Sequence, residues 1–191
     1  MTVDHEEHPM TAARTMLTGI YEHSRFANGR LLDQAERLSD AELDAERPGM
    51  FGTIRSTFLH MMQAQHSWLR RAQELDPIEP WTAETFPTLA DLRNQWDALD
   101  AENLAYLATL TGDQLQEVIH IRSWSGWEMQ APRWQALVHQ AFHQHQHRGE
   151  LAMVLTNLGH SPGELDAFDW FETEGTALDI TPDRPTSPVI N

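Results

Sequence analysis

The chain of 191 residues is long enough for one domain of ordinary size but short for two, and its 40% hydrophobic content, with seven Trp and seven Phe, excludes a disordered chain. A formal net charge of -16 argues against nucleic acid and anionic membrane surfaces as partners. The absence of Cys excludes a disulfide scaffold, a thiolate metal site and a Cys nucleophile.

The N-terminal part of the chain is predicted to hold one long helix and one short one. Residues 1–10 are polar and acidic without the apolar core of a secretory signal, and we expect them to form a flexible tail. Apolar and small residues recur at three-and-four spacing from about Thr11 to Leu38, which predicts the first long helix. Ser39-x-x-Glu42 then has the pattern of a capping box that opens a short helix or turn.

Two further long helices are predicted in the middle of the chain. The second covers roughly Thr53 to Leu75 and ends before an Asp-Pro pair, because the residue before a proline disfavours helical geometry. The third begins at the N-cap residue Thr88 and continues towards Thr111, with apolar residues at helical spacing.

The segment 118–129 differs from the rest of the chain. Residues that favour β-structure flank a Ser-Gly turn there, which predicts a small hairpin or an irregular excursion. The fourth long helix begins after Pro132 and runs to Leu158, with Gly159 as its C-terminal stop. Four long helices with one small excursion before the last of them predict an all-α four-helix bundle over residues 11–162.

Residues 163–191 form an acidic C-terminal extension. Its aromatic residues Phe168, Trp170 and Phe171 predict partial docking on the bundle, whereas the chain from Thr181 onward is predicted to be a loose end. No segment offers about 20 consecutive uncharged apolar residues for a membrane span. With no secretory signal either, the sequence favours a cytoplasmic protein.

Four of the eleven His fall within nine residues of the fourth predicted helix. His139, His143 and His147 recur every four residues and therefore share one face, on a mostly apolar stripe. Two imidazoles spaced in this way can reach one metal ion at about 2.0 to 2.1 Å. The same spacing is compatible with solvated or core-packed His that bind no metal.

A metal site needs a third ligand, and the second predicted helix offers His60. The residues that share its face are small: Thr53, Ser56, Thr57, Ala64 and Ser67. They either leave a groove over a cofactor or form an exposed polar face. Glu150 falls within about 20° of His143 around its helix, so its carboxylate could orient a ligand, act as a general base, bind the metal or form a surface ion pair.

Four sequence segments occur in an order and spacing that are more specific than any single motif. They are Ala27-Asn28-Gly29-Arg30-Leu31-Leu32, Phe51-Gly52-Thr53-Ile54-Arg55-Ser56-Thr57-Phe58-Leu59-His60, Trp68-Leu69-Arg70-Arg71 and His143-Gln144-His145-Gln146-His147-Arg148-Gly149-Glu150. The match extends over about Thr11 to Asp166. In this region the chain resembles the DinB/YfiT-like family of metal-binding four-helix bundles.

The resemblance implies a divalent metal ion, zinc or nickel, held by His60, His143 and His147. His139 matches a His that the family often has one turn earlier, and the resemblance implies that it supports the ligands rather than binding the metal. Three residues depart from the common pattern: Phe142 stands in place of Asn, Gln146 in place of His and Glu150 in place of Gln.

Three neutral His would leave at least one coordination position for water or substrate, as in catalytic zinc sites. The resemblance implies a metal-dependent thiol transferase or thiol-dependent isomerase that joins an external low-molecular-weight thiol to an electrophile, and Glu150 is the candidate catalytic residue. The lack of Cys agrees, because the reacting sulfur would arrive with the cosubstrate. The alternative is a non-catalytic, stress-related metal-binding or interaction protein. A homodimer is the expected assembly, because dimers are the commonest soluble oligomers.

Overall fold

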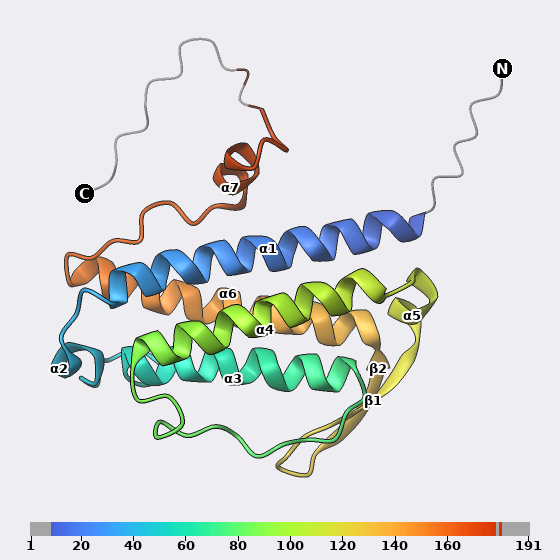
Figure 1. The fold of residues 1–191 in the computed structure, drawn as a ribbon, viewed down its shortest axis with the longest axis horizontal. Coiled ribbons are helices and arrows are strands. Elements are labelled where there is room, and N and C mark those ends of the chain that lie inside the picture. The colour runs from blue at the N-terminus through green and yellow to red at the C-terminus, as the bar shows by residue number, and fades with distance from the viewer. Residues whose placement is uncertain (1–8, 179, 181–191) are drawn as a thin grey trace.

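Four long helices lie side by side in the computed structural model, which describes residues 9–178 and 180 (Figure 1). They are α1 (Pro9–Ala35), α3 (Ile54–Ala72), α4 (Leu89–Thr109) and α6 (Arg133–Asn157). Helices α6 and α4 each pack against both α1 and α3. The predicted all-α four-helix bundle is therefore confirmed.

Short elements connect the long helices: α2 (Asp40–Leu43), α5 (Gly112–Gln116), β1 (Val118–Arg122) and β2 (Glu128–Pro132). A further short helix, α7 (Ala167–Thr173), follows α6. The two strands pair antiparallel, with Val118 opposite Pro132 and Arg122 opposite Glu128. Gly126 adopts a φ of 90° in the turn between them, a conformation that glycine reaches without strain. The hairpin predicted before the last long helix is present, and it continues to Pro132.

Capping boxes start the helices where the sequence predicted them. The Thr88 side chain accepts a hydrogen bond from the backbone N–H of Asp91, and the Asp91 carboxylate accepts one from the backbone N–H of Thr88. Ser39 and Glu42 make the same exchange before α2, and the arrangement also opens α3 and α5. These bonds satisfy backbone donors that a helix start leaves unpaired.

Two long helices end earlier than the sequence predicts. Helix α1 ends at Ala35 rather than Leu38, because residues 37 and 38 donate to carbonyls three residues back and so form a tighter turn. Helix α3 also ends early, at Ala72, since Glu74 adopts a left-handed backbone with φ 57°.

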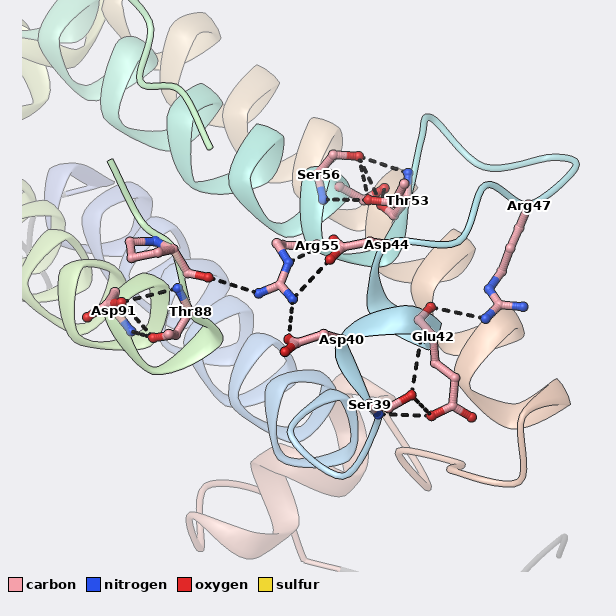
Figure 2. A network of polar contacts seen from close by, with 12 residues as sticks. Ser39, Asp40, Glu42, Asp44, Arg47, Thr53, Arg55, Ser56, Thr88 and Asp91 are labelled. Carbon is pink, nitrogen blue, oxygen red and sulfur yellow. Dashed lines mark hydrogen bonds and ion pairs between the residues drawn. The ribbon is translucent and has the colours of Figure 1, made fainter. Parts of the chain in front are cut away.

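Arg55 ties the start of α3 to the elements on either side of it (Figure 2). Its guanidinium donates to Asp40 at 2.6 Å, to Asp44 at 2.8 Å and to the carbonyl of Pro87 at 3.3 Å. The Arg55 side chain is only 14% exposed, whereas the Asp40 and Asp44 side chains are 91% and 53% exposed, so water and salt still screen these ion pairs. Together with the capping box of α3, Arg55 fixes both ends of the loop that carries Phe51.

A polar cluster is buried between α3 and α4. The side-chain amide of Gln65 donates to Asp100 Oδ1 at 2.6 Å, and its carbonyl accepts from the Trp96 indole at 2.8 Å. Burial raises the pKa of Asp100 to about 6. Apolar side chains surround the cluster and form the core between these helices: Phe58, Met61, Met62, Leu69, Leu92 and Leu99.

The C-terminal segment lies beside α1 and includes α7. Trp170 is 7% exposed, whereas Phe168 is 73% exposed. The predicted loose end from Thr181 onward and residues 1–8 of the predicted N-terminal tail lie outside the described residues, and α1 already begins at Pro9. The described helices include none that is long and apolar enough to cross a membrane.

Candidate metal centre

Three imidazoles meet where α3 and α6 pack together. His60 comes from α3, and His143 and His147 come from consecutive turns of α6. The Nε2 atoms of His60 and His143 are 3.1 Å apart, and one ring nitrogen from each of the three residues lies within 4.8 Å of the others. The structure thus brings together the three histidines that the sequence singled out.

The spacing of these nitrogens suits a single metal ion. Two nitrogens bound to one ion at about 2.0 to 2.1 Å lie about 2.9 to 3.4 Å apart, for bond angles of about 90° to 109°. The 3.1 Å between the Nε2 atoms of His60 and His143 falls within that range. The nitrogen that His147 offers lies within 4.8 Å of the nitrogens of both other residues. The group could therefore hold a divalent metal ion.

Glu150 orients the ring of His147. Its Oε2 accepts a hydrogen bond from Nδ1 of His147 at 2.9 Å and another from the backbone N–H of Phe51 at 3.4 Å. With the proton on Nδ1, Nε2 of His147 keeps its lone pair for a metal. Of the roles that the sequence left open for Glu150, this contact matches ligand orientation, and the metal-binding group found among the described residues contains no carboxylate.

Phe51 packs on two of the three histidines. Its ring stacks on His60 with centroids 4.0 Å apart and meets the ring of His147 edge-on at 5.5 Å. Gly52 permits this approach, because a Cβ there would lie 2.5 Å from Ser56 Oγ, an atom that the capping box holds in place. Sequence reasoning treated Phe51 only as part of the family motif. The signal for Phe51 in the sequence was a large apolar residue two positions before Thr53, the N-cap of α3.

Gln144 is a second residue that sequence reasoning missed. Its side chain is fully buried, and its amide donates to the carbonyl of Met61 in α3 at 2.6 Å. This bond fixes α6 against α3 one residue away from His143. The sequence gave little signal, since Gln and His alternate through the whole segment.

Burial keeps two of the imidazoles neutral. Burial, with a smaller contribution from the rings of His60 and His147, lowers the pKa of His143 to about 4. The pKa of His60 is also lowered, mainly by burial. Nδ1 of His143 is buried without a hydrogen-bond partner among the described residues. Because neutral imidazole is the form that binds metals, both rings are available at neutral pH.

His139 lies one turn before His143 but outside the convergent group. The ring centroids of His139 and His143 are 6.3 Å apart, and His139 packs more closely on Trp68, at 4.3 Å. It therefore borders the three histidines, and its supporting role stays a prediction.

The family model of DinB matches residues 10–180. This chain belongs to the DinB family. The predicted resemblance is therefore confirmed over most of the chain. No curated protein sequence matches this chain.

Solved DinB structures share the fold. A DinB-like protein, YjoA, from Bacillus subtilis is 18% identical with a TM-score of 0.54, and the match covers 74% of this chain and 93% of that one. A DinB-like protein from Bacillus cereus is 18% identical with a TM-score of 0.51, covering 70% and 86%. YfiT from Bacillus subtilis, described as a probable metal-dependent hydrolase with an unusual four-helix bundle topology, is 15% identical with a TM-score of 0.56, covering 83% and 95%.

Proposed function

We propose that this DinB protein is a metal-dependent thiol transferase or thiol-dependent isomerase that uses an external low-molecular-weight thiol. His60, His143 and His147 would hold a divalent ion, zinc or nickel, through their Nε2 atoms. A bound ion supplies a Lewis-acid centre that lowers the pKa of a coordinated thiol. The observation that carries the proposal is a set of three convergent imidazoles beside a carboxylate that is already held by His147.

The side chains around the group leave one approach open to a cosubstrate. His60 and His143 are partly exposed, whereas His147 is only 4% exposed. A thiol could therefore reach the group where His60 and His143 are exposed, beside the Phe51 ring that stacks on His60, while Glu150 holds the buried ring of His147. A structural metal site would instead be closed by a fourth protein ligand.

The hydrogen bonds of Glu150 favour a thiol over water as the nucleophile. Glu150 Oε2 already accepts hydrogen bonds from His147 and Phe51, so only Oε1 is left to act as a general base towards water. A thiol, with an ordinary pKa of about 8.5, needs far less help to ionise than water, at about 15.7. Hydrolysis is the second candidate reaction, because YfiT is described as a probable metal-dependent hydrolase.

Metal content is the first measurement. Protein made without an affinity tag is expected to carry near-stoichiometric metal by mass spectrometry, and His60→Ala and His143→Ala are expected to lose it. His145→Ala is the matched control, since His145 lies on the same helix but is exposed and outside the group. Near-stoichiometric metal persisting in both His60→Ala and His143→Ala would overturn the site.

Turnover is tested by incubating the metal-loaded protein with a panel of low-molecular-weight thiols and electrophiles. We expect a thioether adduct or an isomerised product that forms with wild type and His145→Ala but not with His143→Ala. Metal-dependent product without a thiol would support hydrolysis instead. Stoichiometric metal with no metal-dependent product across the panel would favour the non-catalytic metal-binding protein.

A further inference from the structure

A cavity of about 190 Å³ lies between the C-terminal part of α3, the loop after it and the tip of the hairpin. Three arginines line this cavity: Arg70, Arg71 and Arg122. The chain has only 13 basic residues, all of them Arg, against 29 acidic ones. Three of these cations around one hollow therefore make a local positive site on an acidic protein.

Arg71 has no carboxylate partner among the described residues. Its Nε donates to the backbone carbonyl of Arg122 at 3.2 Å. Its guanidinium lies over the rings of Trp68, at 4.5 Å, and Trp127, at 5.1 Å. Burial lowers the pKa of Arg71, so its charge has already lost part of its water. An anion that reaches Arg71 would meet a positioned, partly desolvated guanidinium.

The two neighbouring arginines are committed to other groups. Arg70 donates through Nε and Nη2 to the backbone carbonyl of Asp76, at 3.2 and 2.9 Å. Arg122 pairs with the Asp76 carboxylate at 3.0 Å. Of the three, Arg71 alone keeps both terminal nitrogens without a hydrogen bond or ion pair among the described residues, and each of its neighbours keeps one.

The walls of the cavity are aromatic and apolar as well as basic. Trp124, 57% exposed, and Trp127, 41% exposed, line it beside Pro77 and Ile78. Indole faces pack well against flat organic groups. A guanidinium fork matches the two oxygens of a carboxylate. The lining therefore suits a flat organic acid better than a small inorganic anion.

The cavity lies on the same side of α3 as the three histidines. Arg71 follows His60 by eleven residues, which places the two side chains about 20° apart around the helix and about 16 Å apart along it. Side chains in a helix lean towards its N-terminus, so the Arg71 head group leans back towards His60. Ala64 and Ser67, two of the small residues noted in the sequence, lie between them. Ser67 itself lines the cavity, so the cavity begins on the face of α3 that carries His60.

We propose that this cavity binds the carboxylate of an organic acid with a flat, unsaturated or aromatic body. Arg71 is the principal donor to the carboxylate, and Trp124 and Trp127 pack against the body. As a binding site the cavity needs no metal. Its use as the substrate pocket, with the acid extending along α3 towards His60, rests on the proposed function.

Binding of trans-cinnamate to the metal-free protein, measured by isothermal titration calorimetry, tests the proposal. We expect Arg71→Gln to weaken binding at least tenfold and Arg71→Lys, which keeps the charge without the fork, to weaken it less. Arg93→Gln is the matched control, because it removes the same charge from an ion-paired Arg on α4 and is expected to leave binding unchanged. Circular dichroism verifies that each variant folds.

Two further probes separate charge from shape. Cinnamamide has the same body without the charge, and inorganic phosphate has charge without the body, so both are expected to bind at least tenfold more weakly than cinnamate. The proposal is overturned if wild type does not bind cinnamate, if folded Arg71→Gln binds it as wild type does, or if either probe binds as tightly.

The same titration on His60→Ala separates this proposal from the proposed function. Cinnamate binding that persists in His60→Ala supports a cavity that binds the acid without a metal. Product formation then decides separately whether the proposed metal chemistry occurs. Loss of cinnamate binding in Arg71→Gln with metal content intact supports the cavity as a distinct site. If Arg71→Gln retains cinnamate binding while the metal-dependent product still forms, the cavity proposal fails and the proposed function stands.

Discussion

Helix α3 presents polar side chains to α4 and to α6, and the two sets differ in whether their polar atoms are paired. Towards α4, Gln65 uses both ends of its amide, one on Asp100 and the other on Trp96. Towards α6, His60 faces the imidazole of His143, whose Nδ1 is buried without a hydrogen-bond partner among the described residues. Five residues separate Gln65 from His60, which is about 140° around the helix.

The difference separates a structural polar group from a binding site. A buried cluster whose donors and acceptors are paired among themselves has nothing left for a ligand and holds two helices in one alignment. Imidazoles that converge through Nε2 can share at most one hydrogen bond there, whereas a cation would engage the nitrogen lone pair of each ring. We therefore expect the first group to control stability and the second to control metal binding.

The largest effect is expected from removing a ligand. Zinc or nickel at about a thousand times its dissociation constant should raise the free energy of unfolding of wild type by about 4 kcal/mol, and His143→Ala should abolish that increase. Thermal unfolding with and without metal measures it. His145→Ala should respond as wild type does, and a metal-induced increase that survives in His143→Ala would contradict the comparison.

The next effect is on the paired cluster. Gln65→Ala should lower the free energy of unfolding by roughly 3 to 5 kcal/mol, because it leaves Trp96 and Asp100 unpaired and opens a cavity. Urea unfolding measures this loss, and metal affinity should stay within about twofold of wild type. Gln146→Ala, at an exposed position on α6, is the control and should change stability by no more than about 0.5 kcal/mol. A Gln65→Ala protein of wild-type stability would refute the structural role.

Stability should also depend on the charge of Asp100. Its folded pKa, about 6, is raised above the ordinary value, so its favourable contribution is complete at pH values below the unfolded pKa and is lost as the pH rises through 6. At pH 8 the lost contribution is up to roughly 3 kcal/mol. Asp100→Asn, which keeps an acceptor for Gln65, should therefore lose less stability than wild type between pH 5 and pH 8. Parallel pH profiles in urea would contradict this sign.

The smallest effect is expected at Glu150. Glu150→Ala removes the acceptor for His147 and should weaken metal binding about tenfold, or about 1.4 kcal/mol. Glu150→Gln keeps an acceptor oxygen and should retain most of the affinity. Competition with a chromogenic chelator measures both. Equal affinity in Glu150→Ala and wild type would show that the ring of His147 needs no orientation.

Much of the fold could be predicted from local patterns. The Thr88 and Ser39 caps were visible as short motifs, and Gly159, with φ 85°, follows the end of α6 as predicted. The predicted ends of α1 and α3 were wrong by about one turn, because apolar spacing does not report the tight turn after Ala35 or the left-handed backbone at Glu74.

The sequence by itself determined which residue types could bind a metal and which of them share a helix face, because helical periodicity is local. It also determined that no cysteine could take part. Only the tertiary structure decided that Glu150 accepts from the backbone of Phe51, that Phe51 stacks on His60 and that Arg71 lies over Trp127 of the hairpin. These contacts join segments from different helices and loops, and their geometry depends on how α3, α6 and the hairpin pack.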